Sequence, residues 1–319
     1  MAYHFAIEET VGEAFDRTSR EQLLGAEAAL RDGLESDPIA AIHKARKSVK
    51  KERALLRLMR GALRRSDRRR ENATLRDAAR RLSGARDAEV IIQTLDGLSE
   101  RYAGQVPHHA FAALRARLQE SLDGAGRGAP AAAAQVASEL AAAREEISGW
   151  TLKRRGWAAV EPGLRRTYKR GVTAFGVARN DPSDEHLHDW RKRVKDLWYE
   201  LRLVAEVCGP SVRGQAKDAH ALADLLGDDH DLAVLRDHLL GLAGGIAADV
   251  EAVLGLLDHR RAQLQAQANA LGERVYSERP KAFVRRLRAC WRAGRRSHTE
   301  AQGREPADLG EAPRAIVTP

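Results

Sequence analysis

The stretch IHKARKSVKKERALLRLMR, from Ile42 to Arg60, occurs twice in this chain of 319 residues. The second copy is LHDWRKRVKDLWYELRLVA, from Leu187 to Ala205, at a constant offset from the first. The polar and cationic residues that match between the copies are His43 with His188, Arg46 with Arg191, Lys47 with Lys192, Lys50 with Lys195, and Arg57 with Arg202. A constant offset over so many positions indicates a duplicated unit.

Both copies carry apolar residues at helical spacing, such as Val49 and Leu56 in the first and Val194 and Leu201 in the second. Residues of an α-helix are rotated by about 100° each, so this spacing predicts two helices with one apolar face. The matched histidine and cations fall on an arc of roughly 100°, nearly opposite that face. Like charges three or four residues apart destabilise a helix by about 0.2–0.5 kcal/mol per pair. A solvated face explains one such arc, but two matching arcs favour a surface that binds an anion.

The composition predicts an all-α protein. Alanine, leucine, arginine and glutamate dominate, and aromatic residues make up only 5% of the chain. The formal net charge is +9. A strongly basic chain favours a polyanionic partner, which includes nucleic acid, an anionic lipid surface and a phosphate polymer.

The sequence predicts a cytoplasmic protein. Its two cysteines, Cys208 and Cys290, do not make a disulfide framework. The first ten residues, MAYHFAIEET, lack the positive and apolar regions of a signal peptide. No apolar run approaches the roughly 20 residues of a membrane span, so we expect no membrane partner.

Proline, glycine and capping residues divide the chain into predicted helices. The expected ranges are 19–34, 38–65, 68–82, 87–101, 107–122, 131–147, 162–179, 184–208, 212–226, 231–242, 247–276 and 280–297. The clearest linker is DGAGRGAP, at 123–130. We therefore expect a first helical bundle over residues 1–150, a second over 151–298, and a disordered tail over 299–319.

The duplication extends beyond the repeated helix. LSGARDAEVIIQTL, from Leu82, aligns with LGDDHDLAVLRDHL, from Leu226, and pairs Asp87 with Asp231. Each half is thus expected to be a bundle of about four main helices, related by a pseudo-two-fold axis around a basic groove or pore. Asp87 and Asp231 follow predicted helix breaks. We interpret them as N-caps, or as partners that hold basic side chains, rather than as catalytic carboxylates.

The two HxxRKxxK stretches and the two L-x-x-x-x-D segments resemble the conserved-histidine α-helical domain family, CHAD, over residues 5–297. The resemblance implies two four-helix bundles around a basic central pore that binds inorganic polyphosphate, and association with polyphosphate granules. Many members of the family carry a triphosphate-hydrolysing domain with an alternating E-x-E-x-K strand motif, which the segment Ile7-Glu8-Glu9-Thr10 does not match, so we expect a non-catalytic protein without metal or cofactor. The ligands that the resemblance implies are His43, Arg46, Lys47, Lys50, Arg57, His188, Arg191, Lys192, Lys195 and Arg202, with Arg20 and Arg165 as additions from the first helix of each half.

The implied ligands suit a phosphate polymer chemically. Arginine binds two oxygens with a planar fork, and lysine provides a mobile point charge. Cations at i, i+3, i+4 and i+7 recur about every 5.4 Å along a helix. His43 and His188 add donors and gain charge when protonated beside a polyanion. The alternative for these two histidines is a hydrogen bond between packed helices.

A first alternative function is a metal-dependent phosphohydrolase that acts on polyphosphate or nucleotides. His188-Asp189 and His230-Asp231 both spell the dipeptide of HD-type enzymes. However, the first half has Lys44 after its histidine and Arg86 in place of His230. The cations beside these residues would also repel a divalent metal ion.

A second alternative is a nucleic-acid-binding protein, which the net charge permits. The basic arcs lack interleaved aromatic residues for base stacking, because Trp190, Trp198 and Tyr199 are expected on or near the apolar side. The sequence leaves open the oligomeric state and the length of polyphosphate preferred.

Overall fold

The computed structural model describes residues 3–82, 85–104, 108–122, 128–242 and 247–301. Within these ranges the chain forms eleven α-helices and one 3-10 helix, with no strand, which confirms the predicted all-α class. The helices are α1 (Val11–Asp32), α2 (Pro38–Leu58), η1 (Met59–Gly61), α3 (Arg65–Arg81), α4 (Ala85–Arg101), α5 (His108–Leu122), α6 (Gly128–Ser148), α7 (Gly156–Asn180), α8 (Asp184–Cys208), α9 (Pro210–Gly241), α10 (Ala247–Val275) and α11 (Pro280–Ala301).

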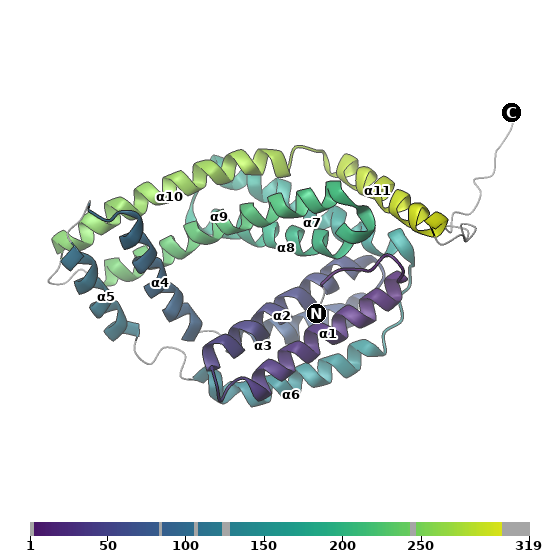
Figure 1. Ribbon diagram of the computed structural model, residues 1–319, viewed down its shortest axis with the longest axis horizontal. Helices are drawn as coiled ribbons and strands as arrows, with labels where there is room; N and C mark the ends of the chain where they lie inside the picture. Colours follow the sequence, from purple (N-terminus) through teal and green to yellow (C-terminus); the bar gives the residue numbers. More distant parts are fainter. Residues whose placement is uncertain (1–2, 83–84, 105–107, 123–127, 243–246, 302–319) are drawn as a thin grey trace.

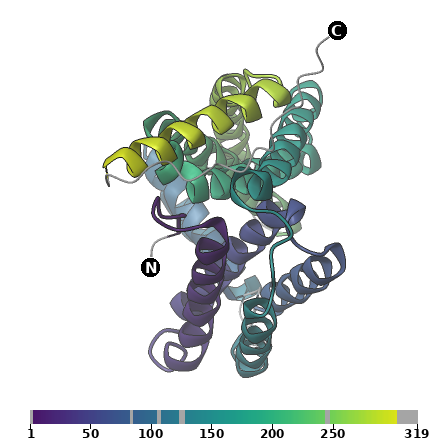
Figure 2. The ribbon, with the colours of Figure 1, turned by 90° about the vertical axis from the view of Figure 1, so that its right-hand side faces the viewer.

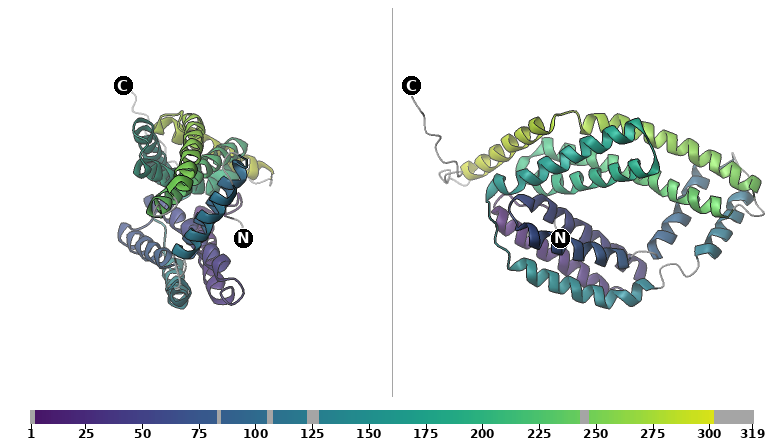
Figure 3. Two further views of the ribbon diagram at one scale, coloured as in Figure 1. Left: turned by 90° about the vertical axis from the view of Figure 1, so that its left-hand side faces the viewer. Right: turned by 180° about the vertical axis from the view of Figure 1, so that it is seen from behind.

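The helices form two layers and a connecting end (Figure 1). Helices α1, α2, α3 and α6 make one layer, and α7 to α11 make the other, as the views from the end and from behind also show (Figures 2 and 3). Helices α4 and α5 lie at one end, against α9 and α10. None of the helices in the described ranges is long and apolar enough to cross a membrane.

Local capping signals explain where the first two helices begin. Thr10 and Glu13 form a reciprocal capping box, so α1 starts at Val11 and not at residue 19 as predicted. Asp37 accepts a hydrogen bond from the Ala40 amide and Pro38 occupies the first turn, which confirms the predicted start of α2. Helix α2 ends at Leu58, short of the predicted residue 65.

Glycine contacts place α7 across the end of α2. A Cβ on Gly163 would lie 2.1 Å from the Leu58 carbonyl oxygen, and one on Gly61 would lie 2.5 Å from Pro162. Only glycine allows two backbones to approach so closely. Gly294 of α11 makes a similar contact with the carbonyl oxygen of Val207 in α8. These contacts lock the C-terminal ends of the two repeat helices against neighbouring helices.

The predicted helix break at Gly227 is wrong, because α9 runs without interruption from Pro210 to Gly241. A glycine inside a helix costs only about 1 kcal/mol, and buried leucines on both sides, such as Leu226 and Leu232, more than offset this cost. Asp231 therefore lies within a helix and is not an N-cap. Asp87 lies in the first turn of α4, and its side chain is outside the described part of the structure.

The buried side chains form two apolar cores. The larger one joins α1, α2 and α6 to α7, α8 and α11. The smaller one joins α4 and α5 of the first half to α9 and α10 of the second. The predicted division of the chain into two bundles at residue 150 stays a prediction. Helices α4 and α5, which precede residue 150, pack on α9 and α10, which follow it. Of the predicted tail, residues 299–301 belong to α11, and the rest lies outside the described residues.

A similar buried contact occurs in each half, although the two pairs are 148 residues apart and the matched repeat positions are 145 apart. The hydroxyl of Ser19 donates to Glu52 at 2.9 Å, and the hydroxyl of Thr167 donates to Glu200 at 2.7 Å. Both glutamates are fully buried, and burial raises the pKa of Glu52 to about 7 and that of Glu200 to about 8. Each pair joins the first helix of its half to the repeat helix. The pseudo-two-fold relation itself remains a prediction.

Candidate functional site

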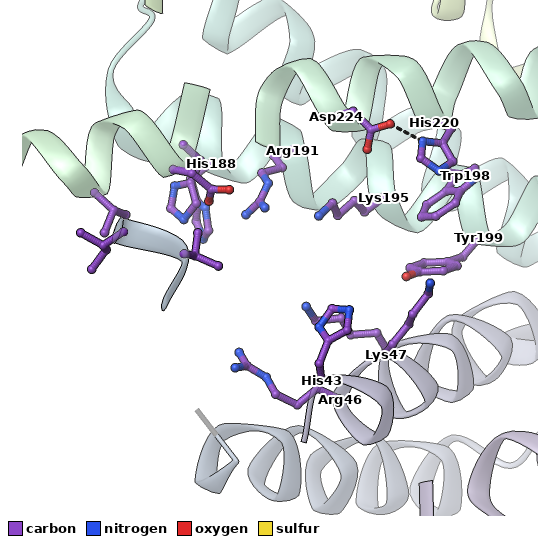
Figure 4. A pocket seen from close by; sticks show the side chains of 16 residues that line it. His43, Arg46, Lys47, His188, Arg191, Lys195, Trp198, Tyr199, His220 and Asp224 are labelled. Atoms are coloured by element: carbon purple, nitrogen blue, oxygen red, sulfur yellow. Dashed lines mark ion pairs between the residues drawn. The ribbon is translucent and has the colours of Figure 1, made fainter. Parts of the chain in front are cut away.

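A cavity of about 660 Å³ lies between the two repeat helices, α2 and α8, and is closed on a third side by α9. Figure 4 shows side chains from α2 and α8 pointing toward one another across it. Seven of the twelve predicted ligands line this central cavity: His43, Arg46, Lys47 and Lys50 from α2, and His188, Arg191 and Lys195 from α8. The tertiary structure thus brings together two arcs that lie about 145 residues apart in the sequence.

The central cavity has an excess of positive charge. Five lysines and arginines line it, against the carboxylates of Asp224 and Asp231 from α9. Asp224 contacts His220 at 2.5 Å. Burial, with Arg191 and Lys50 nearby, lowers the pKa of Lys195 to about 8, although Asp231 and Asp224 oppose this shift. The α9 carboxylates therefore reduce the positive potential of the cavity without cancelling it.

His188 of α8 stacks on His230 of α9, with ring centroids 4.3 Å apart. Burial, followed by the charges of neighbouring cations, lowers the pKa of His188, and burial and Arg191 lower that of His230 to about 4. Both rings are therefore neutral near pH 7 in the unliganded cavity. The Nδ1 atom of His188 is buried without a hydrogen-bond partner in the described structure, so it does not make the helix-packing bond considered as an alternative. His230 is a cavity residue that sequence matching missed, because Arg86 takes its place in the first half.

The other predicted ligands lie outside the central cavity. Lys192 and Arg57 line an adjoining cavity of about 410 Å³. Arg202 lies over the rings of Tyr3 and Trp198 and lines a third cavity, of about 980 Å³. Arg20 is exposed and pairs with Asp16, and Arg165 is also exposed. Neither of these last two arginines lines the central cavity, so the geometry gives no support to their predicted role.

Trp198 and Tyr199 lie on or near the apolar side as expected, since Tyr199 belongs to the larger apolar core and Trp198 packs against it, but both also border the central cavity. Trp198 is half-buried and stacks on Tyr199 with centroids 4.5 Å apart. His220 and Arg202 also pack against its ring. Little of the indole is left for a nucleic-acid base to stack on. Trp190, by contrast, is fully buried as expected.

The histidines of the two His-Asp dipeptides stack on each other, but within the described ranges they do not belong to a group of side chains that could hold a metal ion. Asp189 accepts from Arg193 at 2.8 Å. Asp229, which precedes the second dipeptide, is buried and accepts from Arg261 at 3.0 Å and from Gln265 at 2.9 Å. Over the described ranges, no three histidine, cysteine or carboxylate side chains are grouped so that they could hold a metal ion. Arg261 of α10 pairs with Asp229 of α9 and with Asp184 of α8, and so connects these three helices.

Comparisons with known proteins agree with this architecture. In sequence, the chain is 28% identical over 287 residues to the uncharacterized proteins MT2285 and Rv2226 of two Mycobacterium tuberculosis strains. These matches cover 84% of the chain but 52% of each relative, so the chain spans about half the length of these relatives.

In structure, the chain superposes on the crystal structure of the CHAD domain from the plant Ricinus communis with a TM-score of 0.62 and 19% identity, over 88% of this chain and 96% of that one. It superposes on PptA from Streptomyces chartreusis with a TM-score of 0.61 and 19% identity, over 85% and 100%. At this level of identity, both likenesses concern the fold. The family model for the CHAD domain matches residues 17–240, which is well over half of the sequence. The chain therefore belongs to the CHAD domain family.

Proposed function

We propose that this protein binds inorganic polyphosphate in the central cavity and does not hydrolyse it. The observation that carries the proposal is that the duplicated cations of α2 and α8 line one cavity from two sides. The CHAD family, to which the chain belongs, is associated with polyphosphate binding. If each arc were only a solvent-exposed face of its helix, the two arcs would be expected on separate surfaces of the protein and not in one cavity.

The shape of the cavity suits a linear polyanion. From His43 to Lys50 the cationic face of α2 extends about 10 Å, at about 1.5 Å per residue. Arg191 and Lys195 provide a second row of cations on α8. A chain held between two rows has phosphate oxygens on both sides within reach of donors. Arginine and lysine then replace the counterions of the polymer, and their release favours binding at low salt.

The contacts of the carboxylates support binding without hydrolysis. Asp189 and Asp229 are engaged by arginines, and Asp224 is engaged by His220. Asp231 lies among the cations and raises the pKa of Lys195, which is the behaviour of a positioning partner.

A polymer longer than the cavity would extend beyond the protein. We propose that this is how the protein is retained on polyphosphate granules.

Calorimetric titration with polyphosphates of defined length tests the proposal. Wild type is expected to bind with an affinity that falls steeply with salt, and Arg46→Ala with Arg191→Ala should weaken binding by about 100-fold, at about 1–3 kcal/mol per lost contact. Arg154→Ala with Arg155→Ala removes the same charge at exposed positions outside the cavity and should change the affinity little. Equal losses in the two double variants would show that net charge alone attracts the ligand. Phosphate release during the titration would contradict the non-catalytic assignment.

A further inference from the structure

A second concentration of positive charge lies outside the central cavity. The cavity of about 410 Å³ beside α2 adjoins another of about 390 Å³ between α7 and α8, and the two share Arg170 and Arg193. We call the pair the arginine groove, after Arg53, Arg57, Arg166, Arg170 and Arg193. Nine lysines and arginines line it, against two carboxylates, Asp189 and Asp196.

The arginine groove is continuous with the central cavity. Lys50 of α2 and Lys195 of α8 line both. Along α2 the cations continue on one face from His43 through Lys50 to Arg57, a distance of about 21 Å at 1.5 Å per residue. Around α8, Arg193 is rotated by about 160° from Lys195. A linear ligand that follows α2 therefore leaves the central cavity beside Lys195 and passes to another face of α8.

The side chains of the groove repel one another. Burial and the nearby Arg57 charge lower the pKa of Arg53 to about 10. Burial, followed by the charge of Arg193, lowers the pKa of Arg170. The Nε atoms of Arg57 and Arg193 are buried without hydrogen-bond partners in the described structure. Donors that are held together in this way, at an electrostatic cost, are typical of an anion site.

Asp196 occupies the centre of this arrangement. One of its carboxylate oxygens lies 2.7 Å from Arg57, and the other lies 3.4 Å from Arg193. The three side chains are only 14–20% exposed. The carboxylate thus bridges an arginine of α2 and an arginine of α8, as a phosphate group would. It reduces their repulsion when no ligand is bound.

We propose that the arginine groove is a second polyanion site, in which a polyphosphate chain continues from the central cavity and displaces Asp196 from Arg57 and Arg193. The inference rests on the proposed function, because it assigns the same polymer to a longer path. A short chain fills the central cavity alone. A long chain reaches both sites, and Asp196 competes with it for the two arginines.

Binding of tripolyphosphate and of long-chain polyphosphate to Arg166→Ala with Arg170→Ala tests this path. Both arginines are exposed, so the variant is expected to fold. Its affinity for the long chain should fall about tenfold, and the slope of log K against log salt should decrease by about 0.7 per lost contact. Its tightest tripolyphosphate site should be unchanged. The matched control, Arg154→Ala with Arg155→Ala, should keep the wild-type affinity for both ligands.

Asp196→Asn provides the opposite change at the same place. The amide removes the competing charge with little change in volume, so long-chain affinity should rise severalfold while tripolyphosphate affinity stays constant. Loss of long-chain affinity in Asp196→Asn would overturn the displacement of Asp196.

The outcomes separate the two proposals. If wild type binds neither polyphosphate, the proposed function fails and the groove assignment fails with it. If wild type binds both, but Arg166→Ala with Arg170→Ala behaves like its control or weakens both ligands equally, only the groove assignment is wrong. Wild type could also bind single-stranded RNA more tightly than long-chain polyphosphate. If Arg166→Ala with Arg170→Ala loses this RNA binding and the control variant keeps it, the groove is a nucleic-acid site and the inference is overturned.

Discussion

Lys50 and Lys195, which occupy the same position in the two copies of the repeat, border the same two cavities from opposite helices. The charge of Lys50 contributes to the lowered pKa of Lys195. Two lysines in this position hold positive charge at the junction between the central cavity and the arginine groove. An anion bound between them would offset their mutual repulsion, so we expect these two lysines to have a large effect on binding.

Charge reversal at this junction should have a larger effect than charge loss elsewhere. Lys50→Glu places a carboxylate where both cavities meet, and we expect polyphosphate affinity to fall at least 100-fold, or about 3 kcal/mol, at low salt. Calorimetric titration measures the change, with Arg154→Glu as an exposed control outside the cavities. Similar losses in both variants would argue that the long-range field, and not the junction, governs binding.

Polyphosphate affinity should depend on pH through Lys195. Its pKa is about 8 in the unliganded protein, and a bound polyanion raises it. The protein therefore takes up a proton on binding near pH 8, and affinity is greatest below pH 7 and falls as the pH rises through 8. Titration in buffers of different ionisation enthalpy measures the proton. Lys195→Arg should bind with the same affinity from pH 7 to 9, and persistence of the pH dependence in this variant would rule out Lys195 as its source.

The two buried glutamates should make stability depend on pH. Their folded pKa values, about 7 for Glu52 and about 8 for Glu200, lie above the value of about 4.5 for an exposed glutamate. The folded state therefore retains protons that the unfolded state releases. This stabilisation is complete below pH 4.5 and is lost as the pH rises to 8, with a slope of at most about 1.4 kcal/mol per pH unit for each group.

Glu200→Gln removes one of these titrations and should flatten the pH dependence of the urea midpoint between pH 5 and 8. The exposed Glu185→Gln serves as the control and should retain the wild-type slope. If Glu200→Gln and wild type lose stability in parallel over this range, Glu200 is ionised in the folded protein, contrary to its burial.

The contact between α7 and α2 should tolerate no side chain at Gly163. A Cβ there would lie 2.1 Å from the carbonyl oxygen of Leu58, so Gly163→Ala forces the helices apart and should cost about 1–3 kcal/mol or more. Gly176, in the same helix, has open space around its Cβ position. Gly176→Ala should stabilise the protein by about 0.5–1 kcal/mol. Urea denaturation measures both changes, and a neutral Gly163→Ala would show that the two helices are not held this closely.

The helical class, the duplication and the cationic faces of α2 and α8 could be predicted from the sequence. Helical periodicity and the order of charges are local properties, so the sequence could identify the residues of each cationic face, seven of which meet in one cavity once the two helices pack. The same local signals also predicted a helix break at Gly227 that the structure does not contain. The cost of one glycine in a helix is small, and the buried leucines of α9 offset it only once α8 and α10 pack on them.

The arginine groove could be identified only from the tertiary structure. Arg53, Arg170 and Arg193 come from three helices, and Arg53 aligns with Trp198 in the repeat, so no comparison of the two copies groups them. The pairing of Arg57 with Asp196 joins residues that are 139 positions apart. The sequence fixes which charges a helix carries, because they follow from residue order within a few turns. Which of those charges face each other depends on how the apolar faces pack, since that packing sets the crossing of α2 over α8.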